Sequence, residues 1–268
     1  MSAVTEQSLV SSVKAWFEDY IRRFSSDESL VQRNMDLKAE HTRKVCEAIL
    51  DIGGSLGLSG EDLGLAEASA LLHDIGRFEQ FRQYRTFMDA RSEDHAAIGV
   101  KVIQGSGVLD GVEPAAAEIL VRVVAYHNRA ALPSGENERC LFFLKLLRDA
   151  DKVDIWRVVT EYYSNGGDGK RNQSIELNLP DTDRISDSVY EALMNGKLVQ
   201  MADLRTLQDF KLLQIGWIYD VNFPRTFQIV REMKYLEKIR GALPQGSVRI
   251  AEIYGRARGF LELNAPSV

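Results

Sequence analysis

The sequence contains few of the residues that build a disulfide framework or a membrane span. Only two of its 268 residues are cysteines, Cys46 and Cys140, and no CxxC pair occurs. So low a cysteine count indicates a reducing compartment. No stretch reaches the ~18 uncharged apolar residues of a membrane span, and the N-terminal segment lacks a basic region followed by an apolar run. We therefore expect a cytoplasmic protein without a membrane partner.

Excess positive charge is also missing. The chain has 33 lysines and arginines against 39 aspartates and glutamates, which gives a net charge of -6. This balance argues against an extended nucleic-acid surface, because such surfaces depend on excess positive charge. A small phosphorylated ligand stays possible, since a few local cations are enough to bind it.

Proline is absent from residues 1 to 113, and all six prolines lie at or after Pro114. Apolar residues recur mostly at helical spacing, and no segment alternates cleanly with a period of two. The sequence therefore predicts an all-α fold, with a single domain over residues 1–268. Ser59 followed by Asp62 resembles a capping box that opens one helix, and Ser92 is the expected N-cap of another. Residues 165–186 lack periodicity and are either a lid over a site or a plain connection.

Histidine is scarce, and its placement is the most informative feature of the sequence. The chain has only His41, His73, His95 and His127. Asp74 directly follows His73, and Asp151 lies 24 residues beyond His127. Each of these six residues falls at an apolar-facing position of a predicted helix. Helical bundles build metal sites from ligands on facing helices, and burial of so many polar groups without a metal is costly. One such histidine is more often a hydrogen-bonded core residue, but the joint pattern favours a metal site.

Two short motifs and a preceding histidine follow the pattern of a known family. His41 comes first, His73 and Asp74 open the string HDIGRFEQF, and Asp151 lies within RDADKVD. Together they resemble the HD superfamily of metal-dependent phosphohydrolases, in its HDIG variant. The resemblance covers about residues 35–160. It implies an HD-domain helical bundle as the core and says little about residues 1–34 and 161–268. We expect residues from about 161 to 268 to form a C-terminal helical extension.

The resemblance also implies the ligands of a metal centre. One divalent ion is expected on His41, His73, Asp74 and Asp151. The remaining histidines resemble those of two-metal members, in which the HD aspartate bridges the ions. A second ion is therefore expected on Asp74, His95 and His127. Iron, manganese, zinc, cobalt and magnesium all stay open as the metal.

The implied reaction is hydrolysis of a phosphoester or phosphoanhydride in a small phosphorylated substrate, with nucleotides as the expected class. Arg77 lies one turn after the HD pair, Lys152 follows Asp151, and Arg129 lies two residues after His127. All three are candidate phosphate contacts, and Arg77 and Lys152 are also candidate catalytic residues beside Asp74. The competing interpretation for each cation is a surface or ion-paired residue.

The chain departs from the cyclic-dinucleotide phosphodiesterases of this superfamily. Arg77 stands where those enzymes usually have lysine, Asn128 follows His127 in place of a second histidine, and no GYP tripeptide occurs. Cyclic di-GMP is therefore not the expected substrate. Two other functions stay open: a di-iron oxygenase of the same fold, and a non-enzymatic helical sensor or scaffold. The sequence carries no signal of an oligomeric state.

Overall fold

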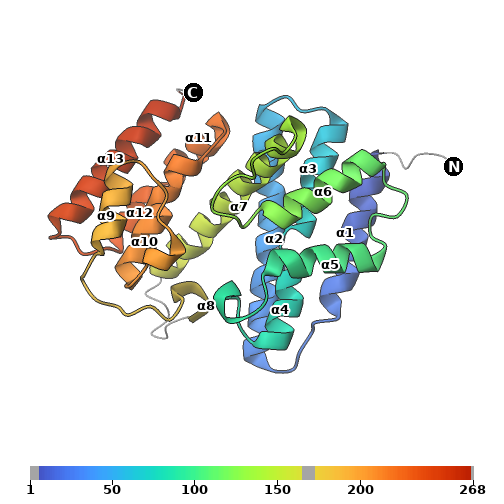
Figure 1. Ribbon diagram of the computed structural model, residues 1–268, viewed down its shortest axis with the longest axis horizontal. Helices are drawn as coiled ribbons and strands as arrows, with labels where there is room; N and C mark the ends of the chain where they lie inside the picture. The colour runs from blue at the N-terminus through green and yellow to red at the C-terminus, as the bar shows by residue number, and fades with distance from the viewer. Residues whose placement is uncertain (1–5, 165–172, 267–268) are drawn as a thin grey trace. The chain divides into compact units, whose positions relative to one another are not determined.

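The chain folds into helices, as its sequence predicts. The computed structural model describes residues 6–164 and 173–266 (Figure 1). No strand occurs among these residues, so the all-α prediction is confirmed. No helix in this part of the chain combines the length and the apolar character needed to cross a membrane.

The fold consists of two compact units, Met1–Asp151 and Lys152–Val268. Helix α7 (Glu138–Ser164) contains the boundary, which lies before the extension expected from about residue 161. The single domain over residues 1–268 stays a prediction.

The first unit is a bundle of long helices. They are α1 (Glu6–Arg22), α2 (Ser29–Ser55), α3 (Gly60–Leu72), α4 (Gly76–Tyr84), α5 (His95–Ser106), α6 (Pro114–Tyr126) and the first half of α7. Helix α3 packs against α1, α2 and α6, while α5 packs against α4 and α6 (Figure 1). Fully buried Ile49, Leu72, Leu120 and Leu144 belong to the core of this unit. The bundle thus brings distant parts of the chain around α3 and the turn that follows it.

Side-chain caps begin α3, α5 and α6, where the caps are Ser59, Asp94 and Glu113. Ser59 is the N-cap of α3 and accepts a hydrogen bond from the backbone N–H of Asp62, as predicted. The expected cap at Ser92 is wrong, because Asp94 caps α5 by accepting from Ala96 N–H. The Ser92 hydroxyl instead donates to the carbonyl of Met88 at 2.9 Å. Asp94 stands directly before the helix, where its carboxylate reaches an unpaired N–H.

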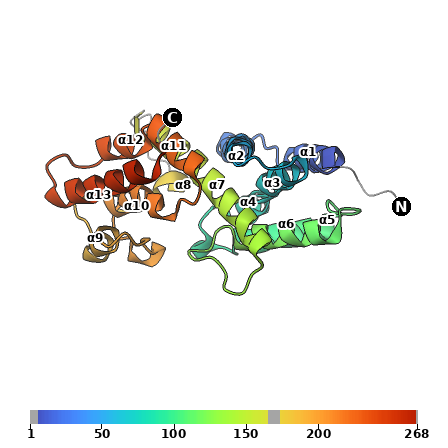
Figure 2. The same cartoon turned by 90° about the horizontal axis from the view of Figure 1, so that it is seen from above.

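The second unit consists of shorter helices. They are the second half of α7, α8 (Gln173–Glu176), α9 (Asp187–Met194), α10 (Leu207–Gly216), α11 (Pro224–Glu232), α12 (Tyr235–Gly241) and α13 (Val248–Asn264). Helix α13 packs against α9, α10, α11 and α12 (Figure 2). Residues 165–172 of the segment that the sequence left as lid or connection lie outside the described residues. Its described part contains α8 and an irregular stretch up to Ser186, and a lid role stays a prediction.

A close backbone approach joins the starts of α4 and α5. A Cβ atom on Gly76 would lie 2.1 Å from the carbonyl oxygen of His95 and 2.6 Å from the backbone nitrogen of Gly99. Both neighbours are backbone atoms, which cannot move aside as a side chain can. Only glycine allows this approach, and it sets the position of His95 relative to the turn before α4.

We expect Gly76→Ala to lower the free energy of unfolding by about 2 kcal/mol or more, because the added methyl group collides with the backbone of α5. Gly105→Ala is a matched control in the same region, since a Cβ there meets nothing within 4 Å. That substitution should stabilise the helix slightly. Urea unfolding followed by circular dichroism measures both variants, and equal stability of Gly76→Ala and the wild type would contradict the assigned role of Gly76.

Candidate metal centre

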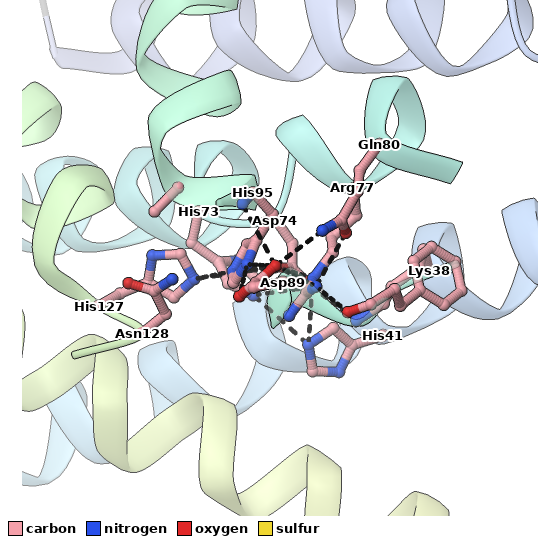
Figure 3. A network of polar contacts seen from close by, with 12 residues as sticks. Lys38, His41, His73, Asp74, Arg77, Gln80, Asp89, His95, His127 and Asn128 are labelled. Carbon is pink, nitrogen blue, oxygen red and sulfur yellow. Dashed lines mark hydrogen bonds and ion pairs between the residues drawn. The ribbon is translucent and has the colours of Figure 1, made fainter. Parts of the chain in front are cut away.

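The structure brings the six predicted ligands together. His41 lies in α2, and His73 and Asp74 lie in the turn between α3 and α4. His95 is the first residue of α5, His127 directly follows α6, and Asp151 lies in α7. They form two groups whose ligand atoms lie within 4.8 Å of one another: His41, His73 and Asp151, and Asp74, His95 and His127. Figure 3 shows the four histidines around Asp74.

The carboxylate of Asp74 faces both groups with different oxygens. Its Oδ1 lies 3.4 Å from His95 Nε2 and 3.7 Å from His127 Nε2. Its Oδ2 lies 3.7 Å from His41 Nε2 and 3.8 Å from His73 Nε2. The side chain is only 5% exposed. A carboxylate placed in this way can contribute one oxygen to each of two neighbouring cations.

The partners of three histidines determine which ring nitrogen carries the proton. His73 Nδ1 lies 2.7 Å from the carbonyl of Ala70, and His127 Nδ1 lies 2.8 Å from the carbonyl of Val124. A carbonyl only accepts, so each Nδ1 is the donor. The same holds for His95, whose Nδ1 lies 2.8 Å from a carboxylate oxygen of Asp89. In the neutral rings, Nε2 is therefore the atom with the free lone pair.

These lone pairs point toward one another inside the protein. Nε2 of His95 and Nε2 of His127 are 3.1 Å apart, and neither carries a proton in the neutral tautomers. Burial, reinforced by the charge of Arg77, lowers the pKa of His95 to about 4, so this ring stays neutral near pH 7. Burial likewise lowers the pKa of His73 to about 4. Two facing lone pairs need a cation between them, and the donor set therefore fits a divalent metal ion.

The carboxylates remain ionised despite their surroundings. Burial alone would raise the pKa of Asp74, but the charges of Lys38 and Arg77 help to hold it well below the usual value. Burial would also raise the pKa of Asp151, which is lowered overall by the hydrogen bond and charge of His41. Neutral His73 and His95 and ionised Asp74 and Asp151 are in the protonation states that metal ligands require.

Most of the ligands lie at helix ends, which corrects the prediction that each occupies a helix face. His73 and His127 are the residues directly after α3 and α6. There each Nδ1–H reaches the carbonyl three residues earlier, at Ala70 and Val124. Carbonyls in the last turn of a helix lack helical partners, so a histidine at this position gains an orienting hydrogen bond that it would not find in mid-helix.

Asp89 is a functional residue that the sequence analysis missed. It lies in the short 3₁₀ helix Asp89–Arg91. Its carboxylate contacts His95 Nδ1, Arg77 Nη1 at 3.1 Å and Gln80 Nε2 at 2.7 Å. Asp89 therefore orients His95 toward Asp74. The segment has no helical periodicity, and a single aspartate six residues before a histidine gives no signal in the sequence.

The three predicted phosphate contacts have different surroundings. Nε of Arg77 is 3.5 Å from Asp74 Oδ1, and its Nη1 donates to the carbonyl of Phe87 at 2.6 Å. The guanidinium of Arg129 lies over the ring of Tyr126, 4.5 Å from its centroid. Nζ of Lys152 is 2.7 Å from Asp220 Oδ2 within the second unit. The contact of Arg77 with Asp74 thus reaches a predicted ligand, and all three roles stay predictions.

The family comparison agrees with this arrangement. Residues 39–156 match the family model described as the HD domain, and this range contains all six ligand candidates. The chain thus contains an HD domain, a helical domain of the metal-dependent phosphohydrolase type, over residues 39–156. HD domains bind divalent metals and are typically hydrolases. Searches among curated proteins and among solved structures found no match.

The lowered histidine pKa values predict how pH affects the metal-free protein. His73 and His95 take up a proton near pH 4 in the folded state but near pH 6.5 in the unfolded chain. Between these values the unfolded chain binds more protons, so acidification lowers the free energy of unfolding. The slope reaches up to about 1.4 kcal/mol per pH unit for each histidine.

Urea unfolding of chelator-treated protein at about pH 7.5, 6.5 and 5.5 measures how the free energy of unfolding changes with pH. His95→Gln should flatten the profile, and a wild-type profile that is already flat would refute the prediction.

The hydrogen bond between Asp89 and His95 predicts that metal binding depends on Asp89. We expect Asp89→Ala to weaken metal binding at Asp74, His95 and His127 by about tenfold to a hundredfold. Asp89→Asn keeps an acceptor for the Nδ1–H of His95 and should lose less. Calorimetric titration of the metal-free variants with Mn²⁺ measures the effect, and binding at His41, His73 and Asp151 serves as the internal control. Unchanged affinity in Asp89→Ala would show that Asp89 does not orient the ligand.

Proposed function

We propose that this protein is a metal-dependent phosphohydrolase that cleaves a phosphoester or phosphoanhydride bond of a small phosphorylated substrate, with nucleotides as the substrate class. The observation that carries the proposal is the position of Asp74. Its two buried oxygens face two separate groups of histidines, and the Nε2 atoms of His95 and His127 both lie beside one of these oxygens. The cytoplasmic location and the lack of an extended nucleic-acid surface belong to the same proposal.

The donor set supports two divalent ions with Asp74 between them. His41, His73 and Asp151 would hold one ion, His95 and His127 the other, and Asp74 would contribute an oxygen to each. Such ions supply hydroxide near neutral pH and stabilise charge on phosphoryl oxygens. Manganese, iron, zinc and cobalt suit imidazole and carboxylate ligands best.

The chain's own cations support a phosphorylated substrate. Arg77 lies beside Asp74, where a guanidinium nitrogen can donate to a phosphate oxygen close to the metal ligands. Its Nη1 already donates to Phe87, Gln80 and Asp89, so a hydrogen bond to phosphate would come from Nε or Nη2 of Arg77. Lys152 and Arg129 belong to the proposal as further phosphate contacts, because they follow the ligands Asp151 and His127 closely in the sequence.

The metal content and its dependence on Asp74 test this function. Elemental analysis of untagged protein, purified without chelator, should find about two ions per chain. Asp74→Asn should lower the content of both ions, since each would lose a charged ligand, and phosphate release from a panel of nucleotides should fall about a hundredfold or more. Exhaustive chelation of the wild type should abolish phosphate release, and the added metal should restore it.

Other outcomes point to the other functions. About one ion per chain would assign His95 and His127 to a role other than metal binding. Bound iron together with oxygen consumption, but no phosphate release, would favour a di-iron oxygenase. A protein that neither contains metal nor takes it up would contradict the enzyme proposal and favour a scaffold.

A further inference from the structure

A lysine outside the six ligands contacts the central carboxylate. Lys38 lies in α2, one turn before His41, and its Nζ is 2.7 Å from Asp74 Oδ2 (Figure 3). The side chain is 17% exposed, and Nζ also lies 5.4 Å from the ring centroid of Phe87. Lys38 directly precedes the residues that match the HD family model, and the sequence analysis did not single it out.

Lys38 contacts the oxygen that faces the first ligand group. Oδ2 of Asp74 is also the atom 3.7 Å from His41 Nε2 and 3.8 Å from His73 Nε2. The ammonium of Lys38 and a cation bound by His41 and His73 would therefore compete for Asp74 Oδ2. Two like charges at such a distance repel, and a divalent ion doubles the repulsion that a monovalent one would meet.

The lysine side chain can move where the neighbouring arginine cannot. Nη1 of Arg77 is held by three acceptors, on Phe87, Gln80 and Asp89. Lys38 has a flexible four-carbon stem and a compact charge, and its ammonium forms an ion pair with Asp74 and lies over the face of the Phe87 ring. A modest rotation of this stem moves the ammonium away from Oδ2 while it stays beside the site.

We propose that Lys38 has two alternative partners. In the metal-free protein its ammonium neutralises Asp74 Oδ2. In the loaded protein it leaves this oxygen and donates a hydrogen bond to a phosphoryl oxygen of the substrate. Lys38 is then a substrate-binding residue that also competes with the metal. The inference rests on the proposed function, because it requires a phosphorylated ligand at this site.

Lys38→Met tests the proposal, because it removes the charge and keeps much of the stem. With Mn²⁺ as the probe, metal-free Lys38→Met should bind the ion at the first group at least about threefold more tightly than the wild type, since the competing ammonium is gone. With inorganic phosphate as the probe, the Mn²⁺-loaded variant should bind about tenfold or more weakly. Lys44→Met is the matched control, because Lys44 lies on the same helix and pairs with Glu47 at an exposed position. It should change neither affinity.

A purely supporting role for Lys38 predicts the opposite pattern. If Lys38 only holds Asp74 in place, Lys38→Met should bind Mn²⁺ more weakly and phosphate as tightly as the wild type, and this result would overturn the proposal. Circular dichroism verifies that the variant folds, and Lys38→Gln replaces it if it does not. Phosphate binding that depends on Lys38, without turnover of any phosphate ester, would contradict the proposed function alone. Equal phosphate affinity in wild type and variant, with turnover intact, would overturn only the inference about Lys38.

Discussion

A buried carboxylate must satisfy both of its oxygens, and the arrangement of the first unit follows from how Asp74 meets this requirement. An ionised carboxylate inside a protein is costly unless cations or donors surround it. Residues from α2 approach Oδ2, and residues from α5 and the end of α6 approach Oδ1. Gly76 allows the approach of α5 to Oδ1, because the absence of a side chain at Gly76 lets the start of α5 lie against the turn that contains Asp74.

The histidines add a second constraint, which concerns direction rather than charge. Carbonyls at two helix ends and the Asp89 carboxylate hold the Nδ1 protons of His73, His127 and His95. Their Nε2 atoms are thereby committed to the interior. Without a cation, the facing lone pairs on Nε2 of His95 and Nε2 of His127 repel each other. A metal ion bound by both nitrogens would replace this repulsion with two coordination bonds. The backbone carbonyls at the ends of α3 and α6 therefore orient the rings of His73 and His127 before a metal binds.

The sequence predicts which residues form this site better than it predicts where they lie on the helices. Spacing and residue type are enough to single out six candidate ligands, which the structure brings together, and the family match over residues 39–156 agrees with the expected core. Helix faces were a poor guide to His73 and His127, because the carbonyls that orient them are available only where a helix ends. Asp89 and Lys38 were invisible for a different reason. Each resembles an ordinary surface charge in the sequence, and only tertiary packing brings it to a ligand.

The charges of the site favour the phosphorylated substrate that we propose. In the metal-free protein the site contains the carboxylates of Asp74, Asp89 and Asp151 and the cations Lys38 and Arg77, and these five groups sum to one negative charge. The proposed loading with two divalent ions changes this sum to three positive charges. A hydroxide and a phosphate dianion together restore neutrality, whereas a neutral substrate would leave the excess charge in a largely buried environment. With two ions bound as we propose, these residues would therefore favour an anionic substrate over a neutral one.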